Sequence, residues 1–311
     1  MEKNKITIAV HNGSFHADDV FAVATLLLMI EEKYNKELSG EKYGVEVVRT
    51  RDPEVIKNAT HVVDVGGVYD PETNRFDHHQ EGGAGVREDG IPYASFGLVW
   101  KQYGEELSGS KEAAGAIEQR LVKCIDATDN GISVMKPERE GLYMYDIKDL
   151  VMTYGATWKE DASALDKNFE YLTSFAKKLM EREIKSIKDI LESEKEVKEI
   201  MANNKDRTLL ILDKPYEYEG VVSINPYILF VVSPKKDGGT WSVKTVRDDF
   251  RSFTHREGLP LEWAGKRDKD LVEITGVEDA IFCHMGRFIA VAQSKEGAIK
   301  LAELALKEAG K

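Results

Sequence analysis

The chain has 311 residues, more than a single hydrophobic core usually holds, and this length favours two domains. Its formal net charge of −12 argues against a broad basic face for long duplex nucleic acid, although it allows a small anionic substrate held by metals and a few arginines. No apolar run approaches the ~20 residues that cross a bilayer, and 42% hydrophobic residues are typical of a globular protein without a membrane partner.

The N-terminal residues, MEKNKITIAVH, lack the long apolar segment of a signal peptide, so we expect a cytoplasmic protein. The two cysteines, Cys124 and Cys283, are too few and too far apart for a disulfide framework or a zinc ribbon. Both stand among apolar residues, and we expect both in the core.

Short apolar strands alternate with helical segments in the first half of the chain, which predicts a parallel sheet with helices on its faces. Strands are expected at residues 6–10, 45–49 and 61–65, with a helix at 20–32 between the first two. Two more helices are expected at 95–103 and 111–127.

A long helical stretch near residues 161–203 carries one apolar seam and many Lys and Glu, which we interpret as a solvated face. After it, apolar runs predict strands at 208–212, 221–224, 228–232 and 241–246, followed by a closing helix at 295–309. The fold class is therefore α/β. We expect an N-terminal Rossmann-like parallel-sheet domain over residues 1–160, a helical linker over 161–204, and a smaller α+β domain over 205–311.

Histidines and aspartates follow the strands and helices of the predicted first domain. Ligands of open α/β sheets bind at the carboxyl ends of strands, so these positions are candidates for chemistry. The candidates, in chain order, are His11, His16, Asp18, Asp64, Asp77, His78, His79, Asp126 and Asp129.

Imidazoles and carboxylates gathered in one crevice suit a pair of divalent cations. Without a metal, repulsion between so many neighbouring carboxylates would force some of them to bind protons. Asp64 is placed to bridge two cations roughly 3.5–4 Å apart, an arrangement that activates a water for attack on phosphorus. Singly, each residue has a structural explanation: Asp18 could cap a helix and His61 could simply begin a strand. The co-occurrence of four motifs at strand or helix ends favours the metal site.

These motifs, HNGSFHADD, VVDVGG, DHH and ATDNG, resemble in order and spacing those of the DHH phosphoesterase superfamily. The longer stretches HNGSFHADDVFA, VVDVGGVYDPETNRFDHHQ and YASFGLVWKQYG resemble its melanocyte-proliferating-gene-type exonuclease branch, and GLPLEWAG and FCHMGRFIA fit that branch more weakly. The resemblance implies an exonuclease that hydrolyses RNA or short oligonucleotides with two Mn²⁺ ions, or Mg²⁺.

The resemblance also implies roles for individual residues. The superfamily's first motif is His, three residues, Asp, one residue, Asp; here His16 stands where the middle Asp is expected, one residue late. Asp129 is preferred to Asp126 because Asn130-Gly131 resembles the turn that trails this ligand. His79 would face the phosphate as a catalytic residue, with Asp77 as a second catalytic candidate. The implied metal ligands are His11, His16, Asp18, Asp64, His78 and Asp129.

In the predicted C-terminal domain, several basic side chains are candidates for binding phosphate through bidentate hydrogen bonds. HMGR, residues 284–287, loosely resembles the superfamily's substrate contacts. The candidates are Arg247, Arg251, Arg256, His284 and Arg287. Two other functions stay open, hydrolysis of a small phosphoanhydride or cyclic dinucleotide and a non-catalytic metal-dependent nucleotide-binding module. A homodimer also stays open.

Overall fold

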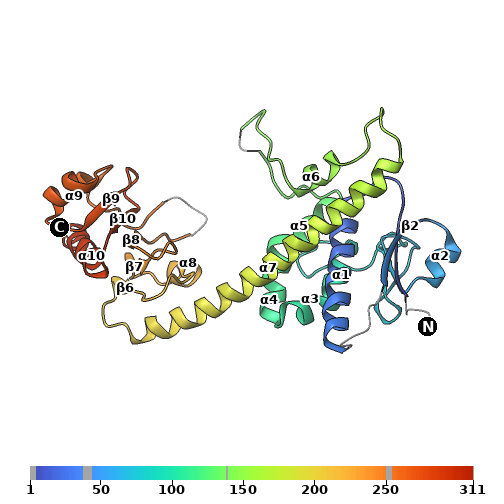
Figure 1. Cartoon of the computed structure of the whole chain (residues 1–311), viewed down its shortest axis with the longest axis horizontal. Coiled ribbons are helices and arrows are strands. Elements are labelled where there is room, and N and C mark those ends of the chain that lie inside the picture. The colour runs from blue at the N-terminus through green and yellow to red at the C-terminus, as the bar shows by residue number, and fades with distance from the viewer. Residues whose placement is uncertain (1–4, 38–43, 138, 250–253, 311) are drawn as a thin grey trace. The chain divides into compact units, whose positions relative to one another are not determined.

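Figure 1 shows the computed structural model, which describes residues 5–37, 44–137, 139–249 and 254–310. Contacts divide the chain into two compact units, Met1–Lys188 and Asp189–Lys311. The division lies inside a long helix, α7 (Ser163–Asn203), at the position of the predicted linker. Each unit contains one five-stranded sheet, so the expected mixed α/β character is confirmed.

The sheet of the first unit has the strand order β2-β1-β3-β5-β4. At its centre, β1 (Lys5–Val10) runs parallel to β2 (Gly44–Arg49) and to β3 (His61–Val63). Val10 pairs with Val63, so β1 and β3 end side by side at one edge. Two short strands complete the sheet: β5 (Arg75–Phe76), parallel to β3, and β4 (Tyr69–Asp70), antiparallel to β5.

The third strand is shorter than predicted because of one backbone angle. Asp64 has a φ of +54°, in the left-handed region, where a strand cannot continue. The strand therefore stops at Val63, and Gly66 and Gly67, also at positive φ, complete the turn. The predicted structural role of His61 is confirmed, since it is the buried first residue of β3.

Helix α1 (Ala17–Glu37) follows β1 and packs against α3 (Ser95–Ser108), where the rings of Phe21 and Phe96 lie 5.4 Å apart. The helix predicted over residues 111–127 consists of three successive pieces. They are α4 (Lys111–Ile117), a π-helical turn (Glu118–Val122) and α5 (Lys123–Asp129). Short α2 (Pro53–Asn58) and α6 (Ile147–Thr153) were not predicted.

The sheet of the second unit has the order β6-β7-β8-β10-β9. Its strands are β6 (Leu209–Ile211), β7 (Phe230–Pro234), β8 (Trp241–Thr245), β9 (Ala280–Cys283) and β10 (Ile289–Ala292). Only β6 and β7 pair in parallel. Helices α9 (Asp268–Thr275) and α10 (Lys295–Ala309) contact this sheet, and α10 has the predicted bounds.

The structure bears on three further predictions, which concern the strand at 221–224, the burial of the two cysteines and the absence of a membrane-spanning helix. The strand predicted at 221–224 is wrong: residues 221–223 belong to α8 (Glu219–Ser223), and Ile224 follows its end. The helix buries both Val221 and Val222, and so short an apolar run is compatible with a strand or a helix. Cys283 is buried as expected, whereas Cys124 is exposed because α5 turns Ile125 and Asp126 inward instead. Within the described residues, no helix has the length and apolar character to cross a membrane.

Candidate functional site

The candidate site begins at the paired ends of β1 and β3. His11 and Asp64 each follow their strand, and Nε2 of His11 lies 3.2 Å from Oδ2 of Asp64. The left-handed backbone of Asp64 turns its carboxylate out of the strand direction. Aspartate tolerates this conformation better than most residues, yet the strain is real and points to a functional constraint.

Asp64 is the most connected carboxylate of the site. Its Oδ1 accepts a hydrogen bond from Oγ of Ser95 at 2.9 Å and lies 3.3 Å from Nε2 of His78. Burial alone would raise the pKa of Asp64, but hydrogen bonds with His11 and His78 overcome that effect and hold the pKa well below its usual value. Asp64 is therefore an anion at neutral pH.

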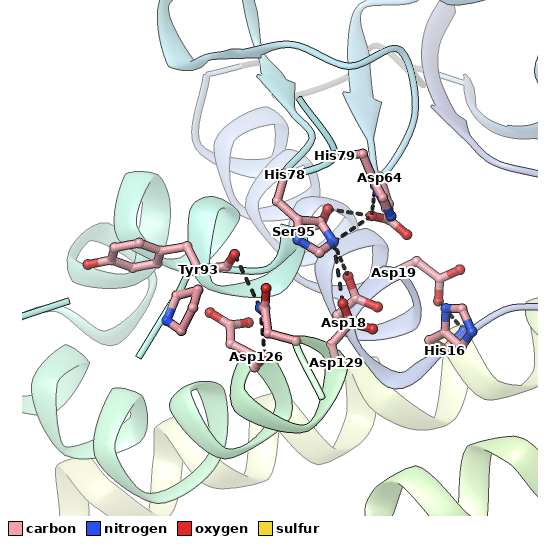
Figure 2. A network of polar contacts seen from close by, with 12 residues as sticks. His16, Asp18, Asp19, Asp64, His78, His79, Tyr93, Ser95, Asp126 and Asp129 are labelled. Atoms are coloured by element: carbon pink, nitrogen blue, oxygen red, sulfur yellow. Dashed lines mark hydrogen bonds and ion pairs between the residues drawn. The ribbon is translucent and has the colours of Figure 1, made fainter. Parts of the chain in front are cut away.

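Helices α1 and α5 bring two more carboxylates to the same place (Figure 2). Nε2 of His78 lies 3.3 Å from Oδ2 of Asp129 and 3.9 Å from Oδ2 of Asp18. Asp18, Asp64, His78 and Asp129 point toward one another in Figure 2, although they come from four separate segments.

The ligand atoms form three overlapping groups, and within each group they lie within 4.8 Å of one another. The groups share Asp64 and His16, so they form one cluster. The three groups are His11, His16 and Asp64; Asp64, His78 and His79; and His16, Asp18 and Asp129. The structure thus brings together all six residues that the sequence nominated as metal ligands.

Asp18 shows that this donor set fits divalent cations. Its carboxylate is fully buried, and neither oxygen has a hydrogen-bond partner among the residues that the structure describes. Burial, and then the charges of Asp64 and Asp129, raise the pKa of Asp18 well above its usual value. A carboxylate in this position is costly unless a cation neutralises it.

Asp19, in the HNGSFHADD motif, lies at the site although the sequence did not nominate it as a ligand or a catalytic residue. Its Oδ2 lies 2.9 Å from Nε2 of His11, and its Oδ1 accepts a hydrogen bond from the backbone N–H of His16 at 3.0 Å. Burial would lower the pKa of His11, but the contacts with Asp19 and Asp64 raise it to about 10. Asp19 therefore fixes the positions of two candidate ligands.

The two histidines of the DHH tripeptide face different surroundings. His78 is nearly buried, whereas the side chain of His79 is 62% exposed. Nδ1 of His79 lies 2.8 Å from Oδ1 of Asp77. Asp77 is buried and also accepts hydrogen bonds from the backbone N–H groups of Gly67 and His79, so it is held rigidly beneath His79.

Asp126 lies outside the ligand cluster. Its Oδ2 accepts a hydrogen bond from Arg87 at 2.6 Å, and its Oδ1 accepts one from the backbone N–H of Gly97 at 3.0 Å. Burial raises the pKa of Asp126 to about 7, against the opposing effect of Arg87. Of the two aspartates that end α5, Asp129 lies with the candidate ligands and Asp126 ties α5 to α3.

Arg49 clamps the loop that carries His11 and His16. Its guanidinium donates to the carbonyl of Gly13 at 2.5 Å and to Oδ1 of Asp166 at 2.6 Å. The same group lies 5.5 Å from the ring centroid of Phe15 and 4.9 Å from that of Phe169. The loop is thus fixed between β2 and the start of α7, a role that the sequence alone did not indicate.

The arginines and the histidine nominated in the second unit occupy separate places. Arg256 uses four of its five N–H donors: it donates to Asp248 and to the backbone carbonyls of Ser223, Asn225 and Ile228. Arg247 donates to Glu219 at 2.6 Å. His284 and Arg287 share the turn between β9 and β10, where Arg287 donates to the carbonyl of Leu259. Arg251 lies outside the described residues.

The sequence is similar to known proteins along nearly its whole length. A model of a family described as Uncharacterised protein family (UPF0160) matches residues 7–306. The MYG1 protein of Dictyostelium discoideum is 31% identical over 333 aligned residues, 98% of each chain. The MYG1 protein of Chlamydia trachomatis is 31% identical over 97% of each chain. The Homo sapiens protein named MYG1 exonuclease is 29% identical over 96% of this chain and 85% of its own. No solved structure matches the chain significantly.

Proposed function

The chain belongs to the MYG1 exonuclease family (UPF0160), and we propose that it is a metal-dependent phosphodiester hydrolase that removes nucleotides from RNA or short oligonucleotides. The observation that carries this proposal is the buried carboxylate of Asp18, which accepts no hydrogen bond from the described residues and belongs to one of three overlapping groups of possible ligands. Some relatives carry the name exonuclease, which supports a nuclease-like function.

We propose His11, His16, Asp18, Asp64, His78 and Asp129 as the ligands of two Mn²⁺ or Mg²⁺ ions. Asp64 and His16 each belong to two of the three groups, but only Asp64 has two equivalent oxygens, which supports a position shared between the two ions for Asp64. Bound cations in such a pair supply Lewis acid stabilisation of phosphate charge and lower the pKa of a water. This is the chemistry of the DHH phosphoesterase superfamily, to which we assign the domain by its motifs.

The chain's own groups then orient the site and manage protons. Nδ1 of His79 is engaged by Asp77, so Nε2 is the nitrogen that faces substrate, and we assign it to the leaving oxygen as general acid. Asp77 is a positioning residue, because it acts through His79. Ser95 and Asp19 orient Asp64 and His11, as outer-shell partners of metal ligands do.

Some, but not all, of the phosphate-binding candidates in the second unit are part of the proposal. His284, Arg287 and Arg247 stay predicted phosphate-binding residues. Arg256 is left out, because four acceptors already occupy its guanidinium. The cytoplasmic location and the homodimer stay predictions.

Substrate competition tests the proposal directly. The purified protein is given a labelled trinucleotide and pyrophosphate side by side with Mn²⁺, and hydrolysis of each is followed. We expect release of mononucleotides from the trinucleotide and loss of that turnover in Asp64→Asn. Turnover of pyrophosphate alone would replace the proposed function by phosphoanhydride hydrolysis, and Mn²⁺-stimulated turnover in Asp64→Asn would remove the bridging role.

A further inference from the structure

A cavity of about 1000 Å³ lies in the first unit, and residues that flank Asp129 in the chain line it. Its lining residues lie within 128–137 and 142–149, between the last turn of α5 and the first turn of α6 (Figure 1). Thr128, the residue before Asp129, lines the cavity, and Gly131 at a φ of +73° turns the chain into its wall. The residues that line the cavity therefore adjoin the candidate ligand Asp129 in the chain.

The wall of this cavity includes several exposed apolar side chains. Five large apolar side chains line it and expose between 43% and 77% of their surface. Exposed apolar patches on soluble proteins are typical of binding sites. The five are Val134, Met135, Leu142, Tyr143 and Met144.

Two lysines and two aspartates line the cavity. Lys136 and Lys148 line it, and neither has an ion-pair partner among the described residues. Its two carboxylates are already engaged: Asp146 accepts from the N–H of Asp149, and Asp149 accepts from the N–H of Asp146, which together cap α6. Available cations thus stand beside an aromatic ring and methionine side chains.

We infer that this cavity binds the nucleobases next to the scissile phosphate of a single-stranded nucleic acid, an inference that rests on the proposed function. Bases stack on exposed aromatic rings whatever their sequence, and lysines pair with the intervening phosphates. Tyr143 is 77% exposed and is the stacking platform. The cavity lies at the upper end of the ~300–1,000 Å³ range of ligand pockets, so it has room for a base with its sugar and phosphate.

The test compares Tyr143→Ala with Tyr143→Phe, which keeps the ring. A matched control is Trp158→Ala, because Trp158 is 90% exposed and does not line the cavity. We expect Tyr143→Ala to raise KM for a trinucleotide about tenfold, the range found for loss of one base stack. The rise for a trinucleotide with abasic sites, which has no base to stack, is expected to be smaller. Tyr143→Phe and Trp158→Ala should keep the wild-type KM for the trinucleotide.

Quenching of a 2-aminopurine trinucleotide supplies a readout that does not depend on turnover. We expect quenching by the wild-type protein and by Tyr143→Phe, and its loss in Tyr143→Ala. Equal quenching and equal KM in Tyr143→Ala would overturn the inference, and so would a change of oligomeric state in that variant, which would assign the cavity to an interface between copies. If wild type hydrolyses nothing but quenching depends on Tyr143, the proposed function fails and the base site stands.

Discussion

Replacing Asp18 by Asn removes one negative charge from a cluster of four carboxylates and leaves the shape of the side chain nearly unchanged. The other three are Asp19, Asp64 and Asp129, and the charge of each raises the pKa of Asp18. Because neither oxygen of Asp18 meets a donor among the described residues, the substitution breaks no hydrogen bond there. The substitution therefore tests the effect of the negative charge of Asp18 apart from any hydrogen bond that it makes.

Burial and the neighbouring charges raise the pKa of Asp18, so its ionised form is disfavoured in the metal-free protein, and an uncharged amide at this position removes that cost. Single substitutions typically change stability by about 0.5–3 kcal/mol, and we expect a net stabilisation of the metal-free protein of that order. A change of 1 kcal/mol shifts Tm by roughly 2–4 °C for a domain of this size, so metal-free Tm should rise by several degrees.

The same substitution should abolish most of the response to metal. A ligand at a hundred times its Kd stabilises a protein by about 2.7 kcal/mol, so wild type should gain roughly 5–10 °C with Mn²⁺. Asp18→Asn should gain far less, because a ligand is lost. The assay is thermal denaturation with EDTA and with Mn²⁺.

Asp126→Asn is the matched control, because Asp126 is an equally buried carboxylate in the same unit and pairs with Arg87 instead of the cluster. We expect it to lower the metal-free Tm and to keep the Mn²⁺ shift. The reasoning is refuted if Asp18→Asn destabilises the metal-free protein and retains the full Mn²⁺ shift, or if the two variants behave alike.

Three further predictions concern residues around the site and in the second unit. Arg49→Met should weaken Mn²⁺ binding about 10–100-fold in calorimetry because the loop with His11 loses its clamp, and equal affinity would contradict this. Burial and Arg75 lower the pKa of His61 from 6.5 to about 4. Between these two pH values the unfolded chain therefore binds a proton that folded His61 does not, and the free energy of unfolding rises by on the order of 3 kcal/mol as pH rises from 4 to 6.5. Urea denaturation in EDTA across that range should show a smaller rise for His61→Gln, and parallel curves would exclude this role. Arg256→Met should destabilise the second unit by about 2–4 kcal/mol in urea, since backbone carbonyls lose their donor, whereas unchanged stability with a raised substrate KM would show a binding role.

Strands and helices with clear periodicity could be predicted from the sequence. β1 was expected at residues 6–10 and is Lys5–Val10, and the closing helix has the predicted bounds. Failures came from short segments whose structure depends on tertiary contacts. The apolar residues 221–224 form a helical turn, and the hairpin of β9 and β10 was missed because HMGR was interpreted only as a binding motif.

The candidate ligands could be predicted because chemistry at strand ends has a strong sequence signal. Their supporting residues could not. Ser95 is 31 positions from Asp64, and Arg49 is 36 positions from the carbonyl that it holds, and neither residue type stands out in its segment. Such contacts depend on how α3 and β2 pack against the site, which no local pattern encodes.

The central claim is that one cluster of side chains holds a pair of divalent cations. Titration of the metal-free protein with Mn²⁺, followed by electron paramagnetic resonance, tests it most directly. The account predicts two ions per chain with an exchange-coupled spectrum, because two ions bridged by one carboxylate lie roughly 3.5–4 Å apart, and loss of coupling in Asp64→Asn. Binding of a single ion, or an uncoupled spectrum at saturation that Asp64→Asn leaves unchanged, would contradict it.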